Sequence, residues 1–197
     1  MNTPLSTQEA GRISSPALLF DRAAIARNIA RTVARAGGAD RLRPHVKTHK
    51  TREIARMWLD AGVTKHKCAT LAEAELLASV GAPDVLVAYP MVGPNCERFA
   101  RLVRHYPRTR FGITVDHSES LRQLHAALVA ARDGVDVYLD VNCGMGRTGI
   151  ELGSDAVRLC REIHSLPAFR LVGLHVYDGH NNQTAIEQRR ELARSII

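Results

Sequence analysis

The stretch "VDVYLDVN", residues 135–142, alternates between apolar and polar side chains. Successive side chains of a β-strand point to opposite faces of the sheet, so this strand is expected to have one apolar and one polar face. The stretches "LRPHVK" (42–47) and "RLVGLHVY" (170–177) show a similar division. Strands buried on both faces of an open α/β sheet would be apolar throughout. A barrel whose interior is polar near the carboxyl ends of its strands explains the pattern better.

The rest of the chain alternates between strand-like and helix-like segments. Six strands are expected, at residues 42–47, 65–70, 84–90, 110–116, 135–142 and 169–177. An amphipathic segment typical of a helix follows each of them. This βα alternation indicates a parallel sheet, either a doubly wound open sheet or a (β/α)8 barrel. The polar strand faces favour the barrel.

Six β/α units are too few to close an eight-stranded barrel. We therefore expect residues 16–197 to form about the first six units of a (β/α)8 TIM-type barrel, after a disordered or extended tail at residues 1–15. The chain is interpreted as a fragment for this reason and also because its last helical pattern ends without a capping signal. The alternative is a smaller complete α/β domain with a ragged C-terminal helix.

Several residues mark expected helix ends. Asp21 and Asp116 each follow an apolar run and are predicted N-caps. Thr70 and Glu73 have the spacing of a capping box, in which a hydroxyl and a carboxylate satisfy the first backbone N–H groups. Gly37 is the predicted stop of the helix that begins after Asp21.

The composition is that of a globular protein, with 45% hydrophobic and 24% charged residues. The sequence shows no signal peptide and no apolar run long enough to span a membrane, so a cytoplasmic protein without a membrane partner is expected. The net charge of +7 permits attraction to anions, but only 5% of the residues are aromatic and no nucleic-acid-binding motif appears. A nucleic-acid partner is therefore not expected. The four cysteines have no metal-like spacing and are expected to be free thiols.

The segment "RPHVKTHK", residues 43–50, concentrates cationic and titratable side chains. On a strand, Lys47 would share the interior face with Arg43 and His45. An amine nucleophile must be unprotonated, and nearby cations and partial burial favour that form. The spacing leaves three readings open: a lysine nucleophile, an anion-binding cluster, or surface charge. A metal pair of His45 and His49 is not expected, because the strand ends between them.

Two further segments carry candidate site residues at the ends of strands. In "CGMGRTG", residues 143–149, glycines let the backbone approach a ligand and Arg147 points towards the barrel mouth. Arg147 is a candidate for binding an anionic oxygen, or else an exposed residue of a structural turn. Tyr177 is expected to face the barrel interior, and Asp178 and His180 follow in the loop. Such a group suits acid–base chemistry, although a single histidine is more often structural.

Taken together, these segments resemble the family of D-threonine aldolases and D-serine dehydratases. These enzymes are pyridoxal-phosphate-dependent and have the alanine-racemase-type barrel, known as fold type III. The resemblance extends from about residue 16 to the end. Its motifs are "SPALLFDRAAIARNIA" (15–30), "LRPHVKTHK" (42–50), "KCATLAEAELLASVGAPDVLVAYPMVG" (67–93), "DVNCGMGRTGI" (140–150) and "GLHVYDGH" (173–180).

The resemblance implies roles for four residues. Lys47 matches the lysine that binds pyridoxal 5'-phosphate covalently, and it is expected to be catalytic as well as cofactor-binding. Arg147 matches the arginine near the phenolic oxygen of the cofactor, and Tyr177 matches the aromatic residue near the pyridine nitrogen. His180 matches the histidine proposed as the base that acts on the β-hydroxyl of the substrate.

The resemblance also implies an activity. We expect a lyase for D-β-hydroxy-amino acids, most simply a D-threonine aldolase type that yields glycine and an aldehyde. Alternatives are a D-serine dehydratase type, an amino-acid racemase and a non-catalytic pyridoxal-phosphate-binding protein. In the family, a C-terminal β-domain and the ligands of a divalent metal (Mn, Mg or Zn) follow the sixth unit. We therefore expect no metal ligand in this chain, a homodimer at full length, and an inactive fragment.

Overall fold

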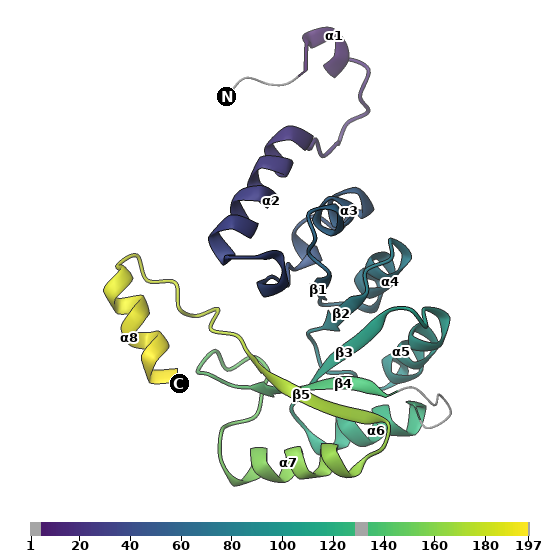
Figure 1. Cartoon of the computed structure of the whole chain (residues 1–197), viewed down its shortest axis with the longest axis vertical. Helices are drawn as coiled ribbons and strands as arrows, with labels where there is room; N and C mark the ends of the chain where they lie inside the picture. Colours follow the sequence, from purple (N-terminus) through teal and green to yellow (C-terminus); the bar gives the residue numbers. More distant parts are fainter. Residues whose placement is uncertain (1–4, 129–133, 197) are drawn as a thin grey trace.

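A computed structural model describes residues 5–128 and 134–196 of the chain. Its centre is a parallel sheet of five strands (Figure 1). These are β1 (Lys65–Cys68), β2 (Asp84–Val87), β3 (Arg110–Val115), β4 (Val135–Val141) and β5 (Phe169–Val176). Each strand pairs with the next one in the chain, in the order β1-β2-β3-β4-β5.

The strand order separates the two architectures that the sequence allowed. In a doubly wound sheet the order reverses at a switch point, whereas a (β/α)8 barrel adds each strand beside the previous one. The order observed here has no reversal. The expected partial barrel is therefore confirmed.

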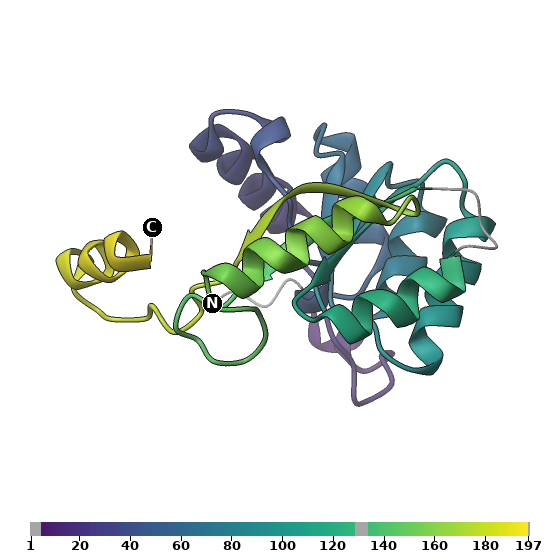
Figure 2. The same ribbon diagram turned by 90° about the horizontal axis from the view of Figure 1, so that it is seen from below.

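The helices are α1 (Thr7–Ala10), α2 (Arg22–Ala36), α3 (Arg52–Asp60), α4 (Leu71–Ser79), α5 (Pro94–His105), α6 (Ser118–Leu128), α7 (Ser154–Ser165) and α8 (Ile186–Ile196). Helices α3 to α7 follow one another around the outer side of the curved sheet (Figures 1 and 2). The 3-10 turns η1 (Ala39–Arg41) and η2 (Val46–Thr48) lie between α2 and α3. Within the described residues, no helix combines the length and the apolar character needed to cross a membrane.

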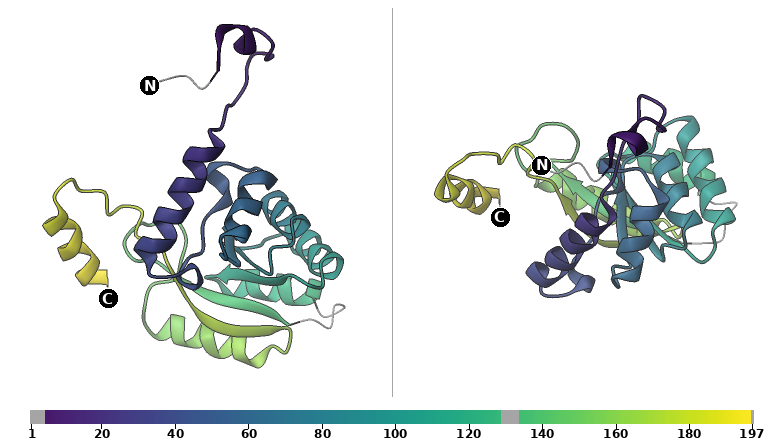
Figure 3. Two further views of the ribbon diagram at one scale, coloured as in Figure 1. Left: turned by 45° about the horizontal axis from the view of Figure 1, so that its top comes forward. Right: turned by 90° about the horizontal axis from the view of Figure 1, so that it is seen from above.

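Two helices stand apart from the sheet. Helix α1 lies at the far end of the extended segment that precedes α2 (Figure 3), so part of the tail expected to be disordered or extended at residues 1–15 is helical. Helix α8 projects away from the sheet in both Figure 1 and Figure 2, and most of its described side chains are exposed.

The first expected strand, at residues 42–47, is wrong in part. Only one bridge forms there, between His45 and Lys67 of β1, with a hydrogen bond from the Lys67 N–H to the Pro44 carbonyl. Proline has no N–H to donate to a sheet, which shortens any strand that contains it. The chain then enters η2, so that Lys47 lies on a 3-10 turn and not on a strand.

The predicted helix signals are mostly confirmed. The Asp21 carboxylate accepts a hydrogen bond from the Ala24 N–H and caps α2, which ends at Gly37 in the left-handed conformation. The hydroxyl of Thr70 caps α4, but the expected capping box is incomplete, because the Glu73 carboxylate accepts from the Ala69 N–H and not from the Thr70 N–H. Asp116 does not cap α6, because its carboxylate accepts a hydrogen bond from the Gly149 N–H instead.

The two faces of the sheet differ as the alternation of β4 predicts. The apolar residues of β4 are buried towards the helices, where Phe99 of α5 and Leu121 of α6 complete the core. The polar side chains of β4 lie on the opposite, concave face. There Asp136 and Asp140 are both buried, and each has cationic or hydrogen-bonding partners.

Strand β5 departs from strict alternation at a bulge. Val137 pairs with Leu171 and Tyr138 with Gly173, so that Val172 is skipped in the register. Leu171 therefore takes the outward position expected for Val172. Beyond the bulge the prediction is confirmed, and the outward Leu174 remains 59% exposed because β5 is an edge strand.

Ion pairs occupy the concave face near the amino ends of the strands. Asp136 of β4 bonds to Arg110 of β3 and to Arg170 of β5. Arg43 pairs with Asp84 of β2. A buried carboxylate is costly without partners, and here two arginines supply them. We therefore infer that Asp136 holds β3, β4 and β5 together at the amino ends of these strands.

Asp136→Asn is expected to lower the free energy of unfolding by about 1–2 kcal/mol, because a charged hydrogen-bond acceptor is lost. The loss is limited to this size because both arginines are half exposed, so that solvent screens their charges. Urea unfolding measures the change. Asp155→Asn is the control, since its pair with Arg158 is exposed on both sides and is expected to contribute no more than about 0.5 kcal/mol. Equal losses in the two variants would contradict the role of Asp136.

Candidate functional site

Three cationic side chains surround the ring of Tyr177 at the carboxyl ends of the strands. The Arg147 guanidinium carbon lies 4.9 Å from the ring centroid, the Lys67 Nζ 5.7 Å, and the Lys47 Nζ 6.0 Å. The site of a (β/α) barrel is built at this end of its strands. The structure therefore brings together three residues that the sequence selected, namely Lys47, Arg147 and Tyr177, and adds Lys67.

His180 lies beside the glycine-rich loop that follows β4. A Cβ atom placed on Gly144 would be 3.2 Å from the His180 Nε2, so a side chain at that position would press on the imidazole. The Nδ1 atom of His180 is buried and has no hydrogen-bond partner. A buried polar atom without a partner is unusual and is often satisfied by a ligand or by water.

The turn that carries Lys47 is held by local hydrogen bonds. The Lys47 N–H donates to the His45 Nδ1 over 3.2 Å, and the Lys50 N–H donates to the Val46 carbonyl over 2.8 Å. Lys50 has a φ of 51°, a conformation that few residues other than glycine adopt. Its Nζ lies 3.2 Å from a carboxylate oxygen of the buried Glu73. This ion pair ties the turn to α4 and so positions Lys47 relative to β1.

His45 lies between the turn and β1 and is neutral at neutral pH. Burial lowers its pKa to about 4, with further lowering by the nearby charges of Lys47 and Lys67. A neutral imidazole has one nitrogen free to accept a hydrogen bond, as the Nδ1 of His45 does from the Lys47 N–H. The protonation state of His45 thus supports the conformation of the turn.

A chain of polar contacts that the sequence did not reveal crosses the mouth of the site. The Lys67 Nζ lies 2.7 Å from the His175 Nε2, and the His175 Nδ1 lies 2.6 Å from an oxygen of Asp140. Burial, followed by the charge of Lys47, lowers the pKa of Lys67. Strand parity places His175 and Asp140 on the polar face, but their contact with Lys67 depends on the curvature of the sheet.

The glycine-rich loop that carries Arg147 is folded against two strands. The Thr148 hydroxyl donates to Asp140 over 2.8 Å, and the Gly149 N–H donates to Asp116 over 2.9 Å. The Asn142 side chain accepts hydrogen bonds from two N–H groups of the same loop. Arg147 is therefore presented by an ordered loop. The signal for Asp116 was its place at the end of β3, which could have indicated a site residue as well as a cap.

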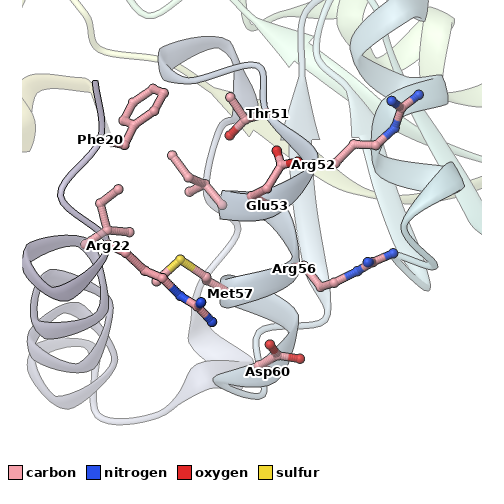
Figure 4. A pocket seen from close by; sticks show the side chains of 10 residues that line it. Phe20, Arg22, Thr51, Arg52, Glu53, Arg56, Met57 and Asp60 are labelled. Carbon is pink, nitrogen blue, oxygen red and sulfur yellow. The ribbon is translucent and has the colours of Figure 1, made fainter. Parts of the chain in front are cut away.

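A separate cavity of about 540 Å³ lies between α2 and α3 (Figure 4). Its lining mixes apolar and charged side chains: Phe20, Arg22, Ile25, Thr51, Arg52, Glu53, Ile54, Arg56, Met57 and Asp60. None of the residues around Tyr177 lines it. Within residues 5–128 and 134–196, no group of three or more histidine, cysteine, aspartate or glutamate side chains could hold a metal ion.

Comparison with known proteins identifies the class. Residues 20–196 match the family described as "Alanine racemase, N-terminal domain", and the chain belongs to this family. Because the match covers almost all of the chain, the barrel and its family assignment rest on the same residues.

Its relatives include two kinds of aldolase. The chain is 30% identical over 185 residues to the D-threonine aldolase of Arthrobacter sp, which covers 93% of this chain and 48% of that protein. It is 28% identical over 183 residues to the 3-hydroxy-D-aspartate aldolase of Paracoccus denitrificans, with 90% and 46% covered. The chain thus spans about half the length of the curated relatives that it matches.

Solved structures agree with these relatives. The crystal structure of D-threonine aldolase from Filomicrobium marinum matches with a TM-score of 0.84 and 33% identity, over 93% of this chain and 50% of that one. The D-threo-3-hydroxyaspartate dehydratase from Delftia sp. HT23 matches with a TM-score of 0.76 and 26% identity, over 94% and 50%. The expected resemblance to D-threonine aldolases is confirmed.

The free energy of unfolding is expected to fall as the pH drops from about 6.5 to about 4. The pKa of His45 is about 4 in the folded chain against an ordinary 6.5, so only the unfolded chain takes up this proton in that window. His45→Gln is expected to make the free energy of unfolding depend less steeply on pH. Part of the dependence remains in this variant, because the pKa values of His49 and His66 are also lowered in the folded chain. Urea unfolding at pH 7 and pH 5 tests this, and an NMR titration of His45 near pH 6.5 would contradict it.

Gly149→Ala is expected to destabilise the chain more than Gly146→Ala. Both positions have positive φ angles, 103° and 65°, which already cost an alanine about 1 kcal/mol. A Cβ at Gly149 would also lie 2.4 Å from the backbone nitrogen of Asn142, whereas Gly146 has no atom within 4 Å. Thermal unfolding of both variants gives the comparison, and equal losses would show that the loop does not depend on this close approach.

Proposed function

We propose that this chain forms the cofactor-binding barrel region of a pyridoxal-phosphate-dependent lyase for D-β-hydroxy-amino acids, of the D-threonine aldolase type. The observation that carries the proposal is the group of Lys47, Arg147 and Tyr177 at one point of the barrel mouth. The similarity to a D-threonine aldolase and to a 3-hydroxy-D-aspartate aldolase supports the reaction class.

The chemistry of these side chains fits the cofactor. Pyridoxal phosphate is an anionic aldehyde, and the site offers an exposed amine, Lys47, among further cations. Lys47 would hold the aldehyde carbon covalently, Arg147 would face an anionic oxygen, and the ring of Tyr177 would lie against the pyridine end. When bound, the cofactor supplies an electron sink for the bond that breaks next to the amino group.

The residues of this chain would then manage protons and orientation. In the aldolase reaction the Cα–Cβ bond of the substrate breaks, the hydroxyl proton leaves, and glycine and an aldehyde result. His180 would accept the hydroxyl proton on a ring nitrogen, and the absence of a hydrogen-bond partner at its Nδ1 supports this proposal. The neutral His45 would leave the surroundings of Lys47 without a further positive charge.

A dehydratase is the second candidate. The relevant observation is the likeness to the D-threo-3-hydroxyaspartate dehydratase of Delftia sp. (strain HT23), at 27% identity over 168 residues. In that reaction Lys47 would take the α-proton and the β-hydroxyl would leave as water. An amino-acid racemase or a non-catalytic binding protein would use the same cofactor residues without this loss of hydroxyl.

The proposal for the full-length enzyme includes a divalent metal (Mn, Mg or Zn), a homodimer and a cytoplasmic location. A metal would stabilise the charge that develops on the β-oxygen. Its ligands would lie outside residues 5–128 and 134–196, among which no suitable group of side chains occurs. The substrate would be a small D-amino acid, in keeping with the names of the relatives.

Lys47→Met is expected to abolish covalent uptake of pyridoxal phosphate, because the reacting amine is lost. The chain is incubated with the cofactor, reduced with borohydride and digested, and the labelled lysine is located by mass spectrometry. The label is expected on Lys47. Lys65→Met, which removes a lysine near the start of β1, is the control and keeps the label on Lys47. Persistence of the same uptake in Lys47→Met would overturn the proposal.

A further inference from the structure

Lys67 is a second lysine of the site, and its amine contacts His175 on the opposite side of the barrel mouth. Its strand, β1, lies at one edge of the sheet, while His175 belongs to β5 at the other edge. The Nζ–Nε2 distance is 2.7 Å. His175 and Asp140 are 9% and 3% exposed and are partners in the β4–β5 register. The amine of Lys67 is therefore held by the buried side chain of His175, which is in turn held by the buried Asp140.

The contacts determine where the hydrogens lie. As an ammonium group Lys67 can only donate, so the His175 Nε2 accepts from it and the His175 Nδ1 carries the hydrogen that is donated to Asp140. Lys67 must donate to that Nε2, which uses one of the three N–H bonds of its ammonium group. The other N–H bonds remain for a ligand on the side of the Tyr177 ring, 5.7 Å away.

The charges around Tyr177 are unbalanced. In the part of the chain that the structure describes, no carboxylate lies within 4.0 Å of the charged groups of Lys47, Lys67 or Arg147. The oxygens of Asp140 are already bonded to His175 and Thr148. By contrast, the arginines at the amino ends of the strands are paired. A half-buried cation without a counter-ion is stabilised by any anion that enters.

We propose that Lys67 binds an anionic oxygen of the ligand, with His175 and Asp140 as positioning residues that aim its ammonium group into the site. The oxygen belongs either to the cofactor or to the carboxylate of the amino acid. This inference rests on the proposed function for the identity of the ligand. It adds a residue to the site, because Lys67 is neither the expected covalent lysine nor the expected partner of the phenolic oxygen.

Lys67→Gln is the test variant, because its amide keeps a hydrogen-bond donor on the side chain while the positive charge is removed. Lys65→Gln is the control, two residues earlier on the same face of β1. Pyridoxal phosphate is titrated and followed by absorbance. The loaded chain is then titrated with D-threonine and with the amino alcohol that lacks its carboxylate. Urea unfolding confirms that each variant is folded, and Lys67→Met replaces Lys67→Gln if the latter is not.

We expect Lys67→Gln to weaken one of the two ligands by at least about tenfold, as for the loss of a charged hydrogen bond. Weaker cofactor binding assigns the oxygen to the cofactor. Unchanged cofactor binding with weaker D-threonine, and no change for the amino alcohol, assigns it to the carboxylate. Affinities equal to those of Lys65→Gln would overturn the proposal and leave Lys67 as a structural tie.

Two variants of His175 test its positioning role. His175→Gln retains an acceptor for Lys67 and is expected to preserve much of the affinity, whereas His175→Leu is expected to lose as much as Lys67→Gln. A similar loss in both His175 variants, with no loss in Lys67→Gln, would show that His175 acts without Lys67.

The inference and the proposed function fail in different ways. If the unmodified chain takes up no cofactor on Lys47, the proposed function fails. The role of Lys67 is then decided without cofactor, by acetic anhydride labelling with and without inorganic phosphate. Protection of Lys67 but not of Lys65 supports an anion site, and equal labelling of Lys67 in both conditions overturns it.

Discussion

The contact between Lys67 and His175 requires the sheet to be curved. Neighbouring strands lie about 4.8 Å apart, so β1 and β5 of a flat five-stranded sheet would be about 19 Å apart. A lysine and a histidine cannot meet across that distance, yet their nitrogens lie 2.7 Å apart. The sheet must therefore curl towards its polar face. The same curvature brings Lys47, from the segment before β1, to Tyr177 at the end of β5.

Charge is distributed unevenly along the concave face. At the amino ends of the strands, arginines and aspartates are paired, as in the contacts of Asp136 with Arg110 and Arg170. At the carboxyl ends the cations around Tyr177 have no carboxylate within 4.0 Å among the described residues. Paired charges stabilise the sheet, whereas unpaired ones attract an anion. One end of the same face thus supports the fold, while the other carries the unpaired positive charge on which the proposed binding of a phosphorylated cofactor and an amino acid depends.

The site depends on short segments that are tied to regular elements. The turn of Lys47 is joined to α4 by the pair of Lys50 and Glu73, and the loop of Arg147 is joined to the end of β3 through Asp116. These ties explain how residues outside the strands are held in place. The cavity of about 540 Å³ between α2 and α3 is lined by none of the four predicted site residues. The proposed site therefore rests on the chemistry of its side chains and not on the volume of a cavity.

The sequence by itself determined the alternation of strands and helices, the polar face of β4, the ends of α2, and the selection of Lys47, Arg147, Tyr177 and His180 as candidates. These follow from local periodicity, capping chemistry and motif resemblance, which act within a few residues. The sequence was less accurate about individual residues. Pro44 reduced the first expected strand to a single bridge, and a bulge in β5 leaves Val172 without a partner in the strand register.

Only the tertiary structure decided that Lys67, His175 and Asp140 form one chain of contacts, and that Asp116 serves the glycine-rich loop instead of a helix. Lys67 and His175 are 108 residues apart. Their contact depends on strand order, register and the curvature of the whole sheet. None of these is encoded in a local pattern, because each arises from the packing of all the strands together.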